Sequence, residues 1–239
     1  MPPADPSDLA ATLAARSPLF HGSGTVRWNA SPATLQAIAR AVSDHTVSIE
    51  TGCGASTVIF AAAGSNHVVV TPAADEFERV VDYCRSIGIS TEKVTLIEGY
   101  SDQVLPRLAP SEYDFVLIDG AHSFPVPAVD FHYLSRQLRI GGLLLLDDAW
   151  IPSVAGVFDY LSAEPSWEQV ALLDRQAVLW KRISEDVCAG GDFWRAQGMN
   201  RNYPDYSFLP FPARLAPLAR KHLLEARSRL IESRTRRRP

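Results

Sequence analysis

Long apolar runs, closely spaced cysteines and phosphate-binding glycine motifs are all absent from this sequence of 239 residues. Because no apolar run approaches the roughly 20 residues that cross a bilayer, we expect no transmembrane helix. The three cysteines, at positions 53, 84 and 188, are too scattered for a metal site. The first five residues lack the basic-then-apolar pattern of a secretory signal, so we expect a reduced, cytoplasmic protein.

Charge is distributed unevenly along the chain. The net charge is −4, but residues 212–239 contain nine basic and two acidic residues and carry +7, which leaves −11 on the rest. The acidic body is expected to repel nucleic acid. The basic end either attracts anions or is simply a solvated helix end.

Apolar segments typical of buried strands alternate with helical segments from residue 46 onward. The expected strands are residues 46–50, 67–70, 94–98, 113–119 and 142–147, and the expected helices are residues 55–63, 75–86, 102–108, 126–138 and 154–161. Near-continuous apolar runs such as 143–146 are typical of parallel strands covered on both faces. Residues 167–172 and 176–181 are expected to add an antiparallel hairpin at the edge. The sequence thus predicts an α/β fold with a doubly wound, Rossmann-like, mostly parallel sheet of seven strands.

Three parts are expected along the chain. They are an N-terminal helical segment at 1–45, a ligand-binding domain at 46–182, and a C-terminal arm with a basic helix at 183–239. Ser31 and Pro32 are a typical start for the second N-terminal helix. The arm is rich in aromatic residues and proline, and we expect it to pack on the domain or on the partner subunit of a homodimer or larger homo-oligomer.

Polar residues or glycines follow each of the five expected parallel strands, at the edge where open parallel sheets bind ligands. They are Glu50 with the turn Gly52, Cys53 and Gly54, then Thr71, then Glu98 to Ser101, then Asp119 to His122, and finally Asp147 and Asp148. The third glycine of a dinucleotide fingerprint and the Gly-Lys-Ser/Thr of a P-loop are both missing. The largely acidic set would repel a pyrophosphate, and it suits a cationic ligand with ribose hydroxyls and an amino group.

Three of these motifs resemble class I S-adenosylmethionine-dependent methyltransferases. They are the Glu-x-Gly-x-Gly turn at 50–54 followed by Ser56 and Thr57, the Ile-Asp-Gly-x-His segment at 118–122, and the Gly-Gly-x₄-Asp-Asp segment at 141–148. The order and spacing are most similar to the branch of small O-methyltransferases that includes catechol and macrolide-sugar enzymes. The resemblance spans about residues 46–181.

The resemblance implies a role for each matched residue. The cofactor-binding positions would be Glu50, Gly52, Cys53, Gly54, Ser56 and Thr57 around the methionine portion, Thr71 at the ribose, Ser101 near the adenine, and Asp119 and Gly120 at the reaction chamber. In relatives a segment before the domain closes over the substrate, and here residues 21–24 with Arg27 and Trp28 are the candidate lid.

One position departs from the family pattern. Relatives usually carry an acid at the end of the second strand that binds both ribose hydroxyls, and this chain has Thr71 there. A charge-assisted hydrogen bond contributes about 1.5–3 kcal/mol, so its loss would weaken cofactor binding by about 10- to 150-fold unless it is replaced. Thr71 itself, Asp75 and Glu76 are the candidates to replace it.

The resemblance also implies a divalent cation at Asp119, Asp147 and Asp148. Mg²⁺ prefers oxygen ligands and would relieve the repulsion among three carboxylates. Adjacent strand residues point to opposite faces, so Asp147 and Asp148 reach one cation only if the strand has ended. The alternative is that Asp148 caps the following helix and Asp147 is a satisfied carboxylate at the end of the sheet.

His122 and Asp119 are the candidate catalytic residues. A base that removes the acceptor's proton typically contributes about 10²- to 10⁴-fold to the rate, and His122 lies in the loop that faces the expected chamber. The alternative is that His122 only hydrogen-bonds its loop or helps to bind the cation. The remaining histidines are expected on the surface or in the core, Trp150 in the pocket wall or the core, and Cys53 is expected to be merely small.

The expected function is methyl transfer from S-adenosylmethionine to a hydroxyl, or less favourably an amine, of a small molecule, in secondary metabolism and with possible help from Mg²⁺. Two alternatives stay open. One is a non-catalytic domain that keeps the fold for a partner, which the missing acid after the second strand favours. The other is a metal-dependent enzyme on the same fold that does not methylate.

Overall fold

A computed structural model describes residues 5–24, 30–174, 176–186 and 196–200 of the chain. The chain divides into two units, Met1–Met199 and Asn200–Pro239. The expected basic C-terminal helix and most of the arm lie outside the described residues, as do Arg27 and Trp28. The homo-oligomer therefore stays a prediction.

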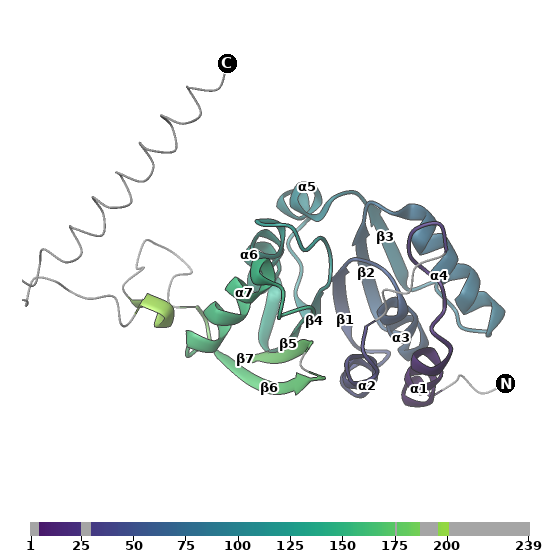
Figure 1. The fold of residues 1–239 in the computed structure, drawn as a ribbon, viewed down its shortest axis with the longest axis horizontal. Helices are drawn as coiled ribbons and strands as arrows, with labels where there is room; N and C mark the ends of the chain where they lie inside the picture. The colour runs from purple at the N-terminus through teal and green to yellow at the C-terminus, as the bar shows by residue number, and fades with distance from the viewer. Residues whose placement is uncertain (1–4, 25–29, 175, 187–195, 201–239) are drawn as a thin grey trace, which may run out of the picture. The chain divides into compact units, whose positions relative to one another are not determined.

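A seven-stranded sheet in the order β3-β2-β1-β4-β5-β7-β6 forms the centre of the first unit (Figure 1). The strands are β1 (Val47–Thr51), β2 (Asn66–Thr71), β3 (Val94–Glu98), β4 (Tyr113–Ile118), β5 (Leu138–Leu146), β6 (Trp167–Leu173) and β7 (Ala177–Arg182). Strands β1 to β5 pair in parallel, and β7 runs antiparallel to both β5 and β6. The predicted mostly parallel sheet with an antiparallel edge hairpin is confirmed.

The helices cover both faces of this sheet. They are α1 (Pro6–Arg16), α2 (Pro32–Ala41), α3 (Ala55–Ala63), α4 (Ala74–Ser86), α5 (Ser101–Val104), α6 (Val126–Gln137) and α7 (Pro152–Ala163), with short 3₁₀ turns η1 (Leu105–Arg107) and η3 (Gly198–Asn200). The sheet has one hydrophobic core on each face, and alternate residues of β4 point into the two. Phe115 and Leu117 pack with α1 to α4, whereas Val116 and Ile118 pack with α6 and α7. The fold is therefore doubly wound, as the apolar runs predicted.

Local sequence signals set most element boundaries. Ser31 caps α2 by accepting a hydrogen bond from the Thr34 amide (3.1 Å), and Pro32 occupies the first turn, as expected. Two boundaries differ from expectation. The helix expected at 102–108 is split into α5 and η1, because Pro106 has no amide proton to continue an α-helix. Strand β5 begins at Leu138, and the segment that contains Gly141 and Gly142 forms a bulge against β4.

None of the helices in the described ranges is long and apolar enough to cross a membrane.

Phe60 of α3 lies in the larger core and is fully buried. Its ring stacks on His67 with centroids 4.0 Å apart and meets Phe115 edge-on at 5.5 Å. The His67 ring in turn lies 2.8 Å from the Ser48 hydroxyl and 3.0 Å from the Glu50 carboxylate. The core therefore continues directly into polar groups at the end of β1.

We predict that Phe60→Ala lowers the free energy of unfolding by about 3–5 kcal/mol, because it leaves a cavity beneath the central strands. Urea denaturation followed by circular dichroism measures this change. Val170→Ala on β6, where the side chain is 51% exposed, is the control and should cost less than about 1 kcal/mol. Similar losses for the two variants would contradict the placement of the core.

Candidate active site

A cavity of about 750 Å³ opens at the carboxyl ends of the parallel strands. It lies where the strand order reverses between β1 and β4, the position at which doubly wound sheets bind ligands. Of the residues predicted for the site, those that line it are Gly52, Cys53, Thr71, Ser101, Asp119, Gly120, His122, Asp147 and Asp148. The structure thus brings together residues that are almost 100 positions apart in the sequence.

The turn after β1 requires a glycine at position 52. Gly52 has φ = +93°, and a Cβ atom placed there would lie 2.2 Å from the backbone oxygen of Asp119. The Gly52 amide donates to the Val70 carbonyl (3.0 Å), and the Asp119 amide donates to the Thr51 carbonyl (3.2 Å). The ends of β1, β2 and β4 are therefore held against one another, and only glycine fits between them.

Glu50 supports this turn from behind. Its carboxylate accepts hydrogen bonds from Ser56 Oγ (2.6 Å) and Thr57 Oγ1 and lies 3.0 Å from His67 Nε2, and the residue is only 1% exposed. Among the described residues, the cavity lining includes neither Glu50, Ser56, Thr57 nor Gly54. Their predicted contact with a cofactor stays a prediction, and what the structure shows is a scaffold for the glycine turn.

Cys53 lies in the same turn. Burial, with the nearby charge of Glu50, raises the pKa of its thiol far above the usual range. The side chain is therefore a neutral thiol, not a nucleophile, as the sequence predicted.

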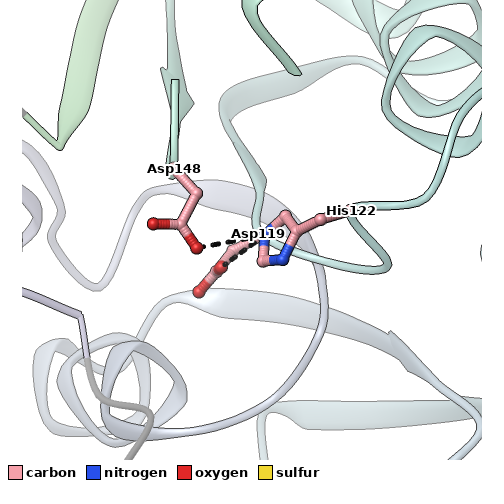
Figure 2. Close-up of side chains that lie close together, drawn as sticks. All are labelled: Asp119, His122 and Asp148. Carbon is pink, nitrogen blue, oxygen red and sulfur yellow. Dashed lines mark ion pairs between the residues drawn. The ribbon is translucent and has the colours of Figure 1, made fainter. Parts of the chain in front are cut away.

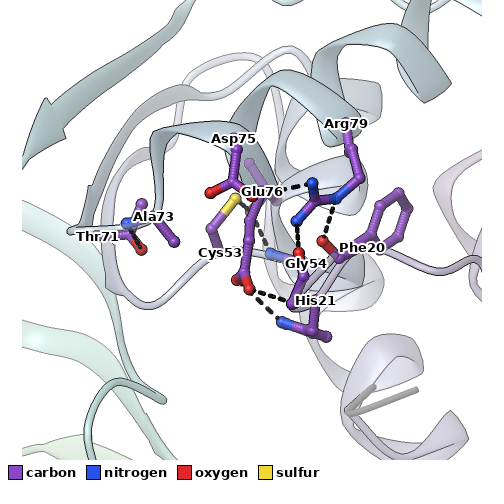
Figure 3. Close-up of polar contacts among 11 residues, drawn as sticks. Phe20, His21, Cys53, Gly54, Thr71, Ala73, Asp75, Glu76 and Arg79 are labelled. Carbon is purple, nitrogen blue, oxygen red and sulfur yellow. Dashed lines mark hydrogen bonds and ion pairs between the residues drawn. The ribbon is translucent and has the colours of Figure 1, made fainter. Parts of the chain in front are cut away.

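Glu76 is the acid that reaches the cavity beside Thr71 (Figure 3). Thr71 Oγ1 accepts the Ala73 amide (3.2 Å), which closes the turn between β2 and α4. Asp75 points outward: its side chain is 65% exposed and pairs with Arg79 at 3.0 Å. Of the three candidates to replace the missing acid, Thr71 and Glu76 face the cavity and Asp75 does not.

The segment before α2 is fastened over the glycine turn by two residues of α4 (Figure 3). Glu76 accepts the Gly22 amide (2.7 Å) and lies 3.1 Å from His21 Nδ1. Arg79 donates to the Phe20 carbonyl (2.6 Å) and to the Gly22 carbonyl. The His21 ring lies against Gly54, where an added Cβ would be 3.2 Å from Nε2.

His21 lines the cavity, whereas the sequence predicted that the histidines other than His122 lie on the surface or in the core. No local sequence pattern predicted this placement, because the position of the His21 ring depends on contacts with Glu76 and Gly54, which are distant in sequence. It does lie within the segment 21–24 that was the candidate lid.

Asp119, His122 and Asp148 form a cluster at the other end of the cavity (Figure 2). His122 Nε2 lies 3.3 Å from Asp148 Oδ2 and 3.8 Å from Asp119 Oδ1. One ligand atom from each of the three residues lies within 4.8 Å of the others. Asp147, the other predicted ligand, lines the cavity but is outside this group, and its Oδ1 accepts the Asp148 amide (2.9 Å).

The backbone at Asp148 explains how consecutive aspartates reach one cavity. Strand β5 ends at Leu146, and Asp148 has φ = +49°, which turns its side chain out of the alternation of the strand. Asp148 Oδ1 then accepts from Trp150 Nε1 (3.2 Å) and Gln176 Nε2 (3.1 Å). Trp150 is 67% exposed, so the alternative that this side chain belongs to the core is wrong. Nothing in the sequence indicated Gln176, which arrives from the turn between β6 and β7.

The carboxylates at this end are strongly coupled. Burial raises the pKa of Asp119 well above its usual range, and the charges of Asp147, Glu50 and Asp148 raise it further. Burial also raises the pKa of Asp147, with a further contribution from the charge of Asp148. Such a group disfavours an anion and stabilises a cation, whether a metal ion or a sulfonium.

Residues 49–149 match the family model of a methyltransferase domain. The match begins in β1 and ends just after β5, so it includes every strand end that lines the cavity. This part of the chain is therefore similar to a methyltransferase domain. A comparison with curated proteins finds no match.

Solved structures share the fold of this methyltransferase domain at low identity. A provisionally assigned O-methyltransferase from Klebsiella pneumoniae is 19% identical with a TM-score of 0.58, covering 77% of this chain and 93% of its own. The O-methyltransferase NovP is 17% identical with a TM-score of 0.58, covering 74% and 95%. The SAH-bound methyltransferase PaMTH1 from Podospora anserina is 13% identical with a TM-score of 0.55, covering 76% and 89%.

A buried carboxylate lies beneath the floor of the methyltransferase cavity. Asp130 of α6 is fully buried, and neither of its carboxylate oxygens has a hydrogen-bond partner within the described part of the chain. A Cβ on Gly120 would lie 3.3 Å from Asp130 Oδ2 and 3.0 Å from Thr51 Oγ1, so both groups lie directly behind Gly120. Burial raises the pKa of Asp130 to about 6, although the nearby hydroxyls of Ser101 and Thr51 oppose part of this increase.

We predict that Asp130→Asn stabilises the protein increasingly as the pH rises. Because the pKa of Asp130 is higher in the folded state, the wild type loses stability between about pH 4 and pH 6 as this group ionises, and asparagine cannot ionise. The variant should exceed the wild type by up to about 3 kcal/mol at pH 8 and match it near pH 4. Urea denaturation at both pH values tests this.

Asp44→Asn, at a side chain that is 65% exposed, is the matched control for this experiment. It should change the free energy of unfolding by less than about 0.5 kcal/mol at either pH. A loss of stability in Asp130→Asn at pH 8 would show that the ionised carboxylate is needed.

Proposed function

We propose that this protein transfers the methyl group of S-adenosylmethionine to a hydroxyl group of a small molecule. The observation that carries the proposal is the layout of the cavity, with a glycine turn at one end and the Asp119, His122 and Asp148 cluster at the other. A volume of about 750 Å³ lies within the range of roughly 300–1,000 Å³ typical of small-molecule sites. The names of the structural neighbours, among them NovP, favour oxygen as the acceptor atom.

The charge of the cavity suits this reaction. The acceptor oxygen attacks the methyl carbon in line with the carbon–sulfur bond, that bond breaks, and the sulfonium becomes a neutral thioether. The carboxylates of Asp119, Asp147 and Asp148 stabilise the cationic cofactor when it binds. Alignment of the two reactants in one cavity supplies a large part of the rate, since it removes the entropy of bringing them together.

The acceptor hydroxyl must also lose its proton. A divalent cation at the acidic cluster would lower the pKa of a hydroxyl bound to it. The cluster fits such an ion, because its carboxylates are crowded and His122 Nε2 is buried without a hydrogen-bond partner among the described residues. His122 is the alternative means of removing the proton, as a general base.

Glu76 is proposed to take the place of the missing ribose acid. A carboxylate offers about four acceptor positions, and those that Gly22 and His21 occupy leave room for the two hydroxyls of a ribose. Both protein contacts also hold the carboxylate in one orientation before the cofactor arrives. The departure after β2 is then a relocation of the acid from the strand end to the first turn of α4.

The function is tested with the full-length protein by calorimetry against S-adenosylmethionine, followed by assays of methyl transfer to a panel of small hydroxylated acceptors with and without EDTA. We expect binding at micromolar to low millimolar concentration and turnover that depends on the acceptor. No binding at millimolar cofactor would favour the non-catalytic alternative. Turnover of an acceptor without methylation would favour the non-methylating enzyme.

We predict that Glu76→Gln weakens the binding of S-adenosylhomocysteine by about 10- to 150-fold, because a charge-assisted hydrogen bond to the ribose is lost. Asp75→Asn is the matched control and should bind within about twofold of the wild type, since its side chain points outward. Calorimetry measures both.

A second ligand separates the ribose contact from the fastening of residues 20–24. The 2′,3′-dideoxy analogue of S-adenosylhomocysteine should bind Glu76→Gln and the wild type almost equally. If Glu76→Gln weakens both ligands to the same extent, as His21→Ala would through the loosened segment, the ribose role of Glu76 is wrong.

A further inference from the structure

We infer that Asp130 is a positioning residue, which fixes the Ser101 hydroxyl as a hydrogen-bond acceptor toward the cavity and so selects a ligand that carries an amino group there. This inference rests on the proposed function, because S-adenosylmethionine supplies two such groups, the 6-amino group of the base and the α-amino group of the methionine portion. Asp130 is not among the described residues that line the cavity, so it would act through Ser101.

Asp130 lies where four elements of the cavity meet. It belongs to α6 and is fully buried. Its Oδ2 lies directly behind Gly120, which follows β4, and the hydroxyl of Thr51, the last residue of β1, lies behind the same glycine. Ser101, the first residue of α5, is close enough to lower the pKa of the Asp130 carboxyl. One buried carboxylate thus faces the ends of β1 and β4 and the start of α5.

The surroundings of this carboxylate offer it little compensation. Neither of its oxygens has a hydrogen-bond partner among the described residues. The groups that act on its pKa besides burial are the hydroxyls of Ser101 and Thr51 and the charge of Asp102, and a cation is not among them. A buried carboxylate without strong donors costs stability, and proteins keep such groups mainly at functional positions. The two hydroxyls are therefore the groups through which Asp130 can act.

The chemistry of the pair sets the direction of the hydrogen bond. An ionised carboxylate only accepts, whereas a hydroxyl has one proton to donate and two lone pairs. The pKa of Asp130 is raised to about 6, so the group is mostly ionised at about pH 8. The two groups are close but not yet bonded, and rotation of the Ser101 side chain would complete the contact. A charge-assisted bond then holds the proton of Ser101 away from the cavity.

Ser101 is the hydroxyl that carries this effect to a ligand. Its residue lines the cavity and is 8% exposed. Thr51 Oγ1, in contrast, is buried behind Gly120. With its proton directed at Asp130, Ser101 presents only lone pairs to the cavity, and these accept from an amino group.

The same arrangement rejects a ligand that has an acceptor in place of the amino group. Two acceptors would then face each other, and the Ser101 proton could turn to the ligand only by leaving the ionised carboxylate unpaired. A site that is built around one hydrogen bond discriminates strongly against analogues that cannot form it. This use gives a reason for keeping a carboxylate that lowers the stability of the folded protein.

The test is calorimetry at about pH 8 with the full-length protein and three ligands. They are S-adenosylhomocysteine, its 6-oxo analogue S-inosylhomocysteine, and its deamino analogue, which lacks the α-amino group. We expect the wild type to bind S-adenosylhomocysteine at least about tenfold more tightly than one of the analogues. The analogue that is rejected identifies which amino group meets Ser101.

Asp130→Leu removes the acceptor without adding a donor, so the Ser101 hydroxyl is free to rotate. The preference should fall to within about threefold in this variant and in Ser101→Ala. Combining the two changes should lower it no further, because both act on one hydrogen bond. Urea denaturation confirms folding, and if Asp130→Leu does not fold, Asp130→Ala, which adds no bulk, takes its place.

Ser135→Ala is the matched control, since Ser135 is also a buried polar residue of α6 but is not part of this cavity's described lining. It should keep the full preference. If Asp130→Leu weakens all three ligands equally, or if Ser101→Ala keeps the preference of the wild type, Asp130 has only a structural role and the inference is wrong.

The same measurements keep this inference apart from the proposed function. A wild type that binds S-adenosylhomocysteine but prefers it to neither analogue overturns the role of Asp130 alone. A wild type that binds none of the three ligands at millimolar concentration overturns the proposed function, and the role of Asp130 falls with it.

Discussion

The buried carboxylate of Glu50 is the interaction on which the cavity depends. It connects the end of β1 to the start of α3, through Ser56 and Thr57, and to β2, through His67. A carboxylate taken out of water is tolerated only when donors surround it, and here three side chains do so. Because these bonds hold the elements at a set distance, the glycine turn has one conformation and presents its backbone to the cavity.

Negative charge accumulates at the edge that this turn opens. Asp119, Asp147 and Asp148 follow two neighbouring strands, and the registry of β4 with β5 places them close together. Burial makes their mutual repulsion stronger than it would be at the surface. The protein therefore maintains a site whose free energy falls when a cation enters.

The N-terminal segment shows how much of the site lies outside the sheet. Glu76 and Arg79, one turn apart on α4, fasten residues 20–24 beside the glycine turn. From the sequence, Asp75 and Glu76 were both candidates to replace the missing acid, and Thr71 was a weaker one. The direction of the first turn of α4 separates the two acids, since it points Asp75 at solvent and Glu76 at the cavity.

The sequence by itself determined the strands, their mostly parallel order, the need for glycine at position 52 and the acidic character of the strand ends. These follow from local patterns of apolar residues and from motif spacing. Only the tertiary structure decided that Glu50 faces inward, that His21 lines the cavity and that His122, not Asp147, lies with Asp119 and Asp148. Those placements depend on side-chain direction and on contacts between segments far apart in the chain, which spacing along the sequence does not encode.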